Sequence, residues 1–108
     1  MAIELSIQPK KSGPESARTV PIATLDTFRR DWLPASQALE LAWIPMFETG
    51  LPVSLEDVAS LVAELRQLEE WVTTHQPEAA ARIGDRVRGL VAELEAAQDA
   101  VGFELYIG

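Results

Sequence analysis

The chain lacks cysteine and contains a single histidine, His75. Without cysteine it cannot form a disulfide, a thiolate zinc site, an iron–sulfur cluster or a cysteine nucleophile. A closed zinc site needs four ligands, and one imidazole does not supply them. His75 is expected at the C-terminal end of a helix, where its interaction with the helix dipole explains its presence without a ligand role. We therefore expect no metal and no cofactor, and the absence of cysteine fits a reducing cytoplasm.

Long hydrophobic runs are also missing. The longest, residues 41–47, is far too short to span a bilayer and is interrupted by Pro45. The first residues lack the basic start and apolar stretch of a secretory signal. We expect a cytoplasmic protein without a membrane-spanning segment.

Catalytic and nucleotide-binding signatures are absent as well. The glycines form neither Gly-x-Gly-x-x-Gly nor a P-loop, and no serine lies in a Gly-x-Ser-x-Gly or Ser-x-x-Lys motif. Carboxylates are numerous, but acid–base catalysis needs two of them in a shared cleft, which sequence cannot show. We predict no catalytic residue and no enzyme activity.

Positive charge is scarce and unevenly placed. The net charge is −8; residues 1–53 contribute −1 and residues 54–108 contribute −7. The acidic second half is repelled by nucleic acid phosphates and by anionic lipid, and it attracts basic partners. We expect no nucleic-acid partner. The simplest alternative is that the acids only keep a small protein in solution.

Apolar residues, by contrast, make up 47% of the 108 residues, so we expect one folded domain over 1–108. Residues 3–7 and 102–107 alternate apolar and polar side chains, as half-buried strands do. Their similar sequences, Ile-Glu-Leu-Ser-Ile and Phe-Glu-Leu-Tyr-Ile, predict two strands of one sheet. Glu104 and Tyr106 should then point away from the core.

The region between residues 8 and 47 is harder to interpret. Residues 8–23 are rich in Pro, Gly, Ser and Lys and predict a mobile loop, whose segment 18–22 could form an edge strand because it contains Pro21. Thr24 is a good N-cap for a helix over 24–33 that could continue to 38. For 39–47 we choose strand over helix, because Leu39, Leu41 and Trp43 alternate. Residues 49–52 should form a turn.

Two long helices follow. Ser54 and Asp57 resemble a capping box, and apolar residues then recur at three- and four-residue spacing, which predicts a helix over 54–75. The same spacing predicts a second helix over 77–100, and the short connection makes the two antiparallel neighbours. Gly84 should lie beside the buried stripe and Gly89 on the exposed side, where the sequence offers no reason for it.

The fold class is therefore α+β: a small two- or three-stranded sheet containing the terminal strands, packed against a long antiparallel helical hairpin plus a short N-terminal helix. The expected core is Ile3, Leu5, Ile7, Phe28, Trp32, Leu41, Trp43, Val58, Leu61, Leu65, Leu68, Val72, Ile83, Val87, Leu90, Leu94, Phe103, Leu105 and Ile107.

For function, the sequence favours a non-catalytic protein–protein interaction domain, such as an inhibitor or immunity-type protein that masks a basic partner. The alternatives are a self-assembling homodimer, and a small-ligand binder or enzyme whose site no motif reveals. The predicted interaction surface consists of Glu64, Glu69, Glu70, Glu93, Glu95, Asp99 and Trp43. For Trp43, core packing is the simpler alternative. Lysine at position 64 or 70 should then leave folding intact and change only binding.

Overall fold

The computed structural model describes residues 2–9, 18–99 and 103–108. The strands are β1 (Ala2–Pro9), β2 (Arg18–Thr24), β3 (Leu51–Val53) and β4 (Phe103–Ile107). The α-helices are α1 (Leu25–Thr27), α2 (Leu33–Ala38), α3 (Val58–His75) and α4 (Pro77–Asp99). A π-helical segment, η1 (Phe28–Trp32), joins α1 to α2, and two 3-10 helices, η2 (Ile44–Glu48) and η3 (Leu55–Asp57), flank β3.

The four strands form one antiparallel sheet in the order β2-β1-β4-β3. The two terminal strands are the central pair, as their similar sequences predict, with Leu5 opposite Ile107 and Ile7 opposite Leu105. Both edge strands contain a proline, Pro21 in β2 and Pro52 in β3, because proline cannot donate to a central ladder. The β1–β2 register skips Ile22, and the side chain of this residue is buried.

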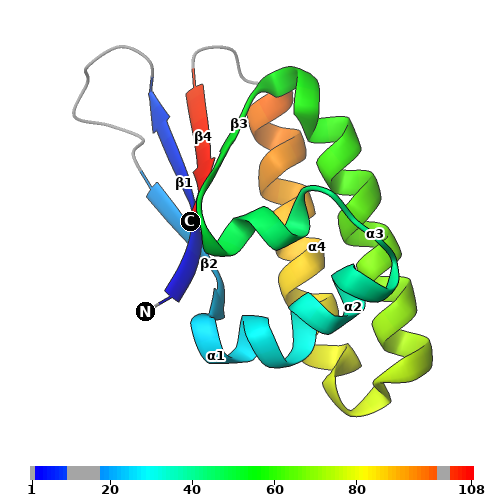
Figure 1. Ribbon diagram of the computed structural model, residues 1–108. Coiled ribbons are helices and arrows are strands. Elements are labelled where there is room, and N and C mark those ends of the chain that lie inside the picture. The colour runs from blue at the N-terminus through cyan, green and yellow to red at the C-terminus, as the bar shows by residue number, and fades with distance from the viewer. Residues whose placement is uncertain (1, 10–17, 100–102) are drawn as a thin grey trace.

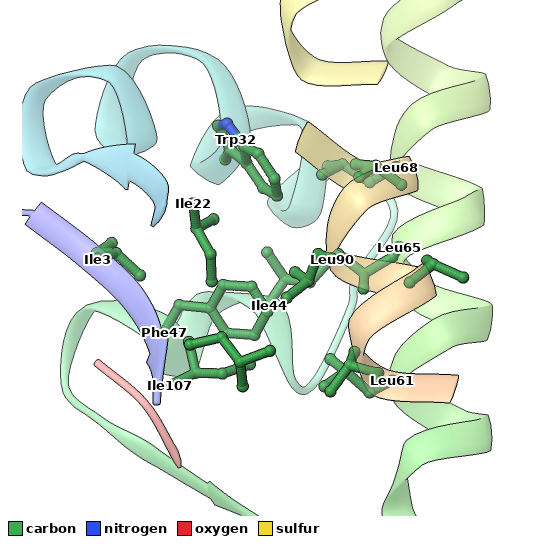
Figure 2. Close-up of a cluster of buried hydrophobic side chains, with 14 of the residues drawn as sticks. Ile3, Ile22, Trp32, Ile44, Phe47, Leu61, Leu65, Leu68, Leu90 and Ile107 are labelled. Atoms are coloured by element: carbon green, nitrogen blue, oxygen red, sulfur yellow. The ribbon is translucent and has the colours of Figure 1, made fainter. Parts of the chain in front are cut away.

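One face of the sheet is covered by the helices and the other is open (Figure 1). The alternating apolar residues of the central strands face the α3–α4 hairpin, whose stripes are fully buried. Figure 2 shows Leu61, Leu65, Leu68 and Leu90 reaching toward Trp32, Ile44 and Phe47. The α+β class with a long helical hairpin is therefore confirmed, and the sheet has one strand more than the largest number we expected.

The N-terminal helical region runs from Leu25 to Ala38 with a change of pitch. Thr24 caps it as predicted, since its hydroxyl accepts the Thr27 amide at 3.1 Å. The π-helical turn lies just before Pro34, which removes a backbone donor and crowds the preceding turn. The helix continues past this point to Ala38, the longer of the two lengths considered.

The predicted strand over 39–47 is wrong. The helix ends in a Schellman motif: Glu40 takes a positive φ of 55°, and the amides of Glu40 and Leu41 bond to Gln37 and Ser36. The chain then forms η2, in which Ile44 and Phe47 are buried at three-residue spacing. Leu41 and Trp43 pack against the core but are only half-buried.

Two boundaries also differ from the expectation. Both ends of the predicted loop over 8–23 belong to strands, because β1 extends to Pro9 and β2 begins at Arg18; residues 10–17 lie outside the described residues. The third strand to join the central pair is β3, in the stretch expected to be a turn. Helix α4 and β4 match the predicted segments, except that residues 100 and 102 are not described, and the side chain of Phe103 is likewise outside the description.

The predicted capping box at Ser54 does not form. The Ser54 hydroxyl donates to the Asp57 carboxylate at 2.8 Å, and no side chain caps η3. A 3-10 turn over Leu55–Asp57 leads into α3 instead. Among the described residues, no helix combines the length and apolar character that crossing a bilayer requires.

Substitution of Gly89 tests whether its position on α4 is free of tertiary contacts. It is exposed, and a Cβ at this position would meet nothing within 4 Å. Gly89→Ala should therefore raise the free energy of unfolding by about 1 kcal/mol, through helix propensity alone. Chemical denaturation measures this. Gly84→Ala is the matched comparison: its Cβ would lie 3.0 Å from Arg88 Nη1 and Glu69 Oε2, so its gain should be smaller. Equal gains would contradict the packing at Gly84.

Candidate functional site

A hollow of about 850 Å³ lies on the open side of the sheet. Its floor comes from β1, β4 and β3, and its wall from the segment that leads into α3. Ser6 and Gln8 of β1, and Glu104 and Tyr106 of β4, line it because the alternation that buries Leu5 and Leu105 turns these neighbours to the other face.

Tyr106 is the aromatic centre of this open face. Its cross-strand neighbours are Ser6 and Pro52, and its side chain is 46% exposed. Gly50 and Gly108 make room for the ring, since a Cβ at Gly108 would lie 2.7 Å from Tyr106 Cε1 and a Cβ at Gly50 would overlap the hydroxyl. Gly50 also has a φ of +106°, which only glycine adopts readily. The glycines thus hold open space for an exposed aromatic ring.

Every charged side chain among the described lining residues is a carboxylate. Glu56 and Asp57 come from η3, and Glu104 comes from β4. Glu56 and Glu104 are exposed, while Asp57 is half-buried and accepts the Ser54 hydroxyl. Apolar lining comes from Pro52, Val53 and Leu55. The hollow thus combines negative charge, an exposed phenol and an apolar wall, which suits a basic side chain with an aliphatic stem. We call it the acidic hollow.

The structure places Glu64, the first residue of the predicted interaction surface, against the protein's own backbone. Its carboxylate accepts the amide of Ala42 at 3.2 Å, that of Trp43 at 2.9 and 3.1 Å, and that of Ile44 at 3.2 Å. These amides open η2, so Glu64 supplies the cap that its first turn otherwise lacks. These contacts give a physical reason to revise the expectation that lysine at position 64 leaves folding intact, and we now expect this substitution to destabilise the fold.

Among the other predicted surface residues, Glu69 and Glu95 line one small hollow on the helical hairpin, together with Arg66 and Arg88. Glu69 pairs with Arg88 at 2.7 Å, Glu70 is exposed on α3, and Glu93 is half-buried on α4. Glu95 is exposed beside this hollow of about 230 Å³. The side chain of Asp99 lies outside the description. Trp43 packs partly on the core and gives its amide to Glu64.

His75 has a structural setting at the last residue of α3. Its ring stacks on Trp71 with a centroid distance of 4.3 Å and an interplanar angle of 12°. Nδ1 lies 3.0 Å from the Trp71 carbonyl oxygen. Within the described ranges, no group of three or more histidine, aspartate or glutamate side chains is arranged to hold a metal ion.

Sequence reasoning missed the acidic hollow, although part of its signal was visible. The alternation in β4 points Glu104 and Tyr106 outward, as expected from the sequence. The convergence with Glu56 and Asp57 depends on β3 pairing with β4, and that strand was expected to be a turn. Compared with protein-family models, with curated proteins and with solved structures, the chain gives no match.

Proposed function

We propose that this protein is a non-catalytic interaction domain that binds a basic segment of another protein in the acidic hollow. The observation that carries the proposal is the charge of the hollow: Glu56, Asp57 and Glu104 line it together with the exposed Tyr106. An arginine or lysine entering it would meet carboxylates for charge-assisted hydrogen bonds and a ring for cation–π contact.

The rest of the charge distribution supports a basic partner. The net charge of −8 attracts cationic surfaces over distances of about a Debye length, ~10 Å at 0.1 M salt. Such complementarity mainly accelerates and orients the encounter. Inhibitor or immunity-type masking of a basic enzyme is one form that this binding would take.

A non-catalytic role is supported by the position of the only imidazole. Helix α3 has 18 residues and starts at Val58, beside the hollow, whereas His75 is its last residue. At a rise of 1.5 Å per residue, the 17 steps from Val58 to His75 separate the histidine from the start of α3 by about 26 Å. The hollow therefore contains carboxylates and hydroxyls but no histidine to act as a base near neutral pH.

The test compares two charge-reversed double variants in affinity copurification from the native lysate. Glu56→Lys with Glu104→Lys reverses the hollow; Glu70→Lys with Glu95→Lys makes the same charge change on exposed helix surface. We expect one basic protein to bind the wild type and the helix variant and to elute at high salt. Reversing the hollow should weaken its binding at least about tenfold, as measured with the purified partner.

Three outcomes would contradict the proposal. Equal binding by both double variants would remove the hollow from the interface. Affinity that is unchanged between low and high salt would exclude charge complementarity as its basis. Recovery of the protein alone, with a concentration-dependent oligomer in solution, would favour the homodimer.

A further inference from the structure

A second hollow, of about 520 Å³, lies between the end of β2, the N-terminal helix and the first turns of α4. It shares no lining residue with the acidic hollow. In Figure 1 it corresponds to the region where the end of β2 meets α1 and the N-terminal part of α4, away from β3.

Three arginines line this hollow, although the protein as a whole is acidic. They are Arg30 from η1 and Arg82 and Arg86 from α4, accompanied by Asp31 and Asp85. Asp31 has a largely buried side chain, 10% exposed, and forms two 3.0 Å hydrogen bonds with Arg30. This pairing raises the pKa of Arg30, through the hydrogen bond first and the charge second. Both carboxylate oxygens of Asp31 thus accept a hydrogen bond from Arg30.

Arg82 and Arg86 keep most of their donors unused. Arg82 Nη2 lies 3.9 Å from the Asp31 carboxylate, beyond hydrogen-bond distance. Arg86 Nη1 reaches only the Pro21 carbonyl oxygen, at 3.4 Å. Asp85 also lines the hollow, and its carboxylate accepts a 2.6 Å hydrogen bond from Arg88. Each guanidinium offers five N–H donors. The contacts among the described residues therefore leave most donors of Arg82 and Arg86 free to bind a ligand in the hollow that they line.

The spacing of Arg82 and Arg86 along α4 does not favour the folded helix. Residues four apart lie on the same side of a helix, and like charges at this spacing destabilise it. Beside them, the Thr24 hydroxyl donates to Thr27 Oγ1 at 2.9 Å. A hydroxyl both donates and accepts and its proton can rotate, so the Thr27 hydroxyl can donate to a ligand in the hollow that it lines. Two guanidinium forks and a hydroxyl donor are the groups that bind a tetrahedral oxyanion.

We propose that this hollow binds a phosphate group, held between Arg82 and Arg86 with the Thr27 hydroxyl as an additional donor. The negative charge of the largely buried Asp31 repels anions from the inner part of the hollow, so the phosphate lies at the solvent-exposed edge of the hollow. The group is either inorganic phosphate or the phosphate ester of a larger molecule, because the donors recognise the oxygens that both share.

The experiment is a titration of the isotope-labelled protein, followed by amide chemical shifts, with inorganic phosphate and separately with phosphoserine at constant ionic strength. Saturable shifts should appear for residues 22–31 and 82–86. Arg82→Gln and Arg86→Gln should each weaken binding about tenfold, the effect of losing one charged hydrogen-bonding group. Arg66→Gln, the same charge change on the exposed side of α3, should leave the affinity unchanged.

Tighter binding of phosphoserine would identify an ester as the ligand, and tighter binding of inorganic phosphate would identify the free ion. Shifts that never saturate with either anion would overturn the proposal. So would an equal loss of affinity in Arg66→Gln, which would mean that bulk charge accounts for the binding. Amide spectra of the variants report whether they are folded, and all three arginines are exposed.

Discussion

Glu64→Lys should lower the free energy of unfolding by about 2 to 4 kcal/mol, measured by chemical denaturation. The carboxylate accepts three consecutive amides at the start of η2. Lysine has no acceptor, so the change removes the cap and places a positive charge against N–H groups that carry partial positive charge. Ile44 and Phe47, both buried, depend on the position of this 3-10 helix.

Glu70→Lys is the matched control, because it makes the same charge change at an exposed position of α3. Its effect should stay within about 0.5 kcal/mol, as is usual for surface substitutions. Glu64→Gln should lie between the two, since an amide oxygen still accepts hydrogen bonds but carries no charge. Equal stability of the two lysine variants would mean that Glu64 does not cap η2.

Leu65→Asp should abolish folding. Leu65 is 0% exposed in the centre of the α3 stripe and belongs to the buried cluster that also contains Leu90 of α4. Aspartate there creates a cavity and buries a charge without a partner, two costs that together exceed about 5 kcal/mol and so approach the whole stability of a small domain. Circular dichroism and amide dispersion in the NMR spectrum measure the loss.

The control is Gln67→Asp, which introduces the same side chain two residues further along α3 at an exposed position. It should remain folded and lose only a few tenths of a kcal/mol of helix propensity. A folded Leu65→Asp variant with native stability would show that the α3 stripe does not face the core.

The helical hairpin could be predicted because the spacing of its apolar residues is a local pattern that repeats several times along each helix. The three- and four-residue spacing places Leu61, Leu65 and Leu68 on one side of α3 in any environment. The connection between α3 and α4 is short, and this geometry makes the two helices antiparallel neighbours. The terminal strands were predictable for the same reason, since alternation at period two marks the buried side of each strand.

The segment 39–47 could not be predicted in this way, because its local pattern fits two structures. Leu39, Leu41 and Trp43 alternate like a strand, while Ile44 and Phe47 are three apart, as in a 3-10 helix. The tertiary environment decides between them: Glu64, twenty residues away from Ile44 in the chain, accepts the amides that start the 3-10 helix. No pattern within 39–47 contains that information.

By itself, the sequence determined the α+β class, the buried stripes of the hairpin, the neighbouring terminal strands, and the absence of cysteine chemistry. Only the tertiary structure decided which charged side chains act together. Glu64 turns to the backbone, Glu69 pairs with Arg88, and Glu56, Asp57 and Glu104 meet at the acidic hollow. The physical reason is that burial follows a periodic pattern along the chain, whereas a cluster of charges arises from contacts between segments far apart in sequence.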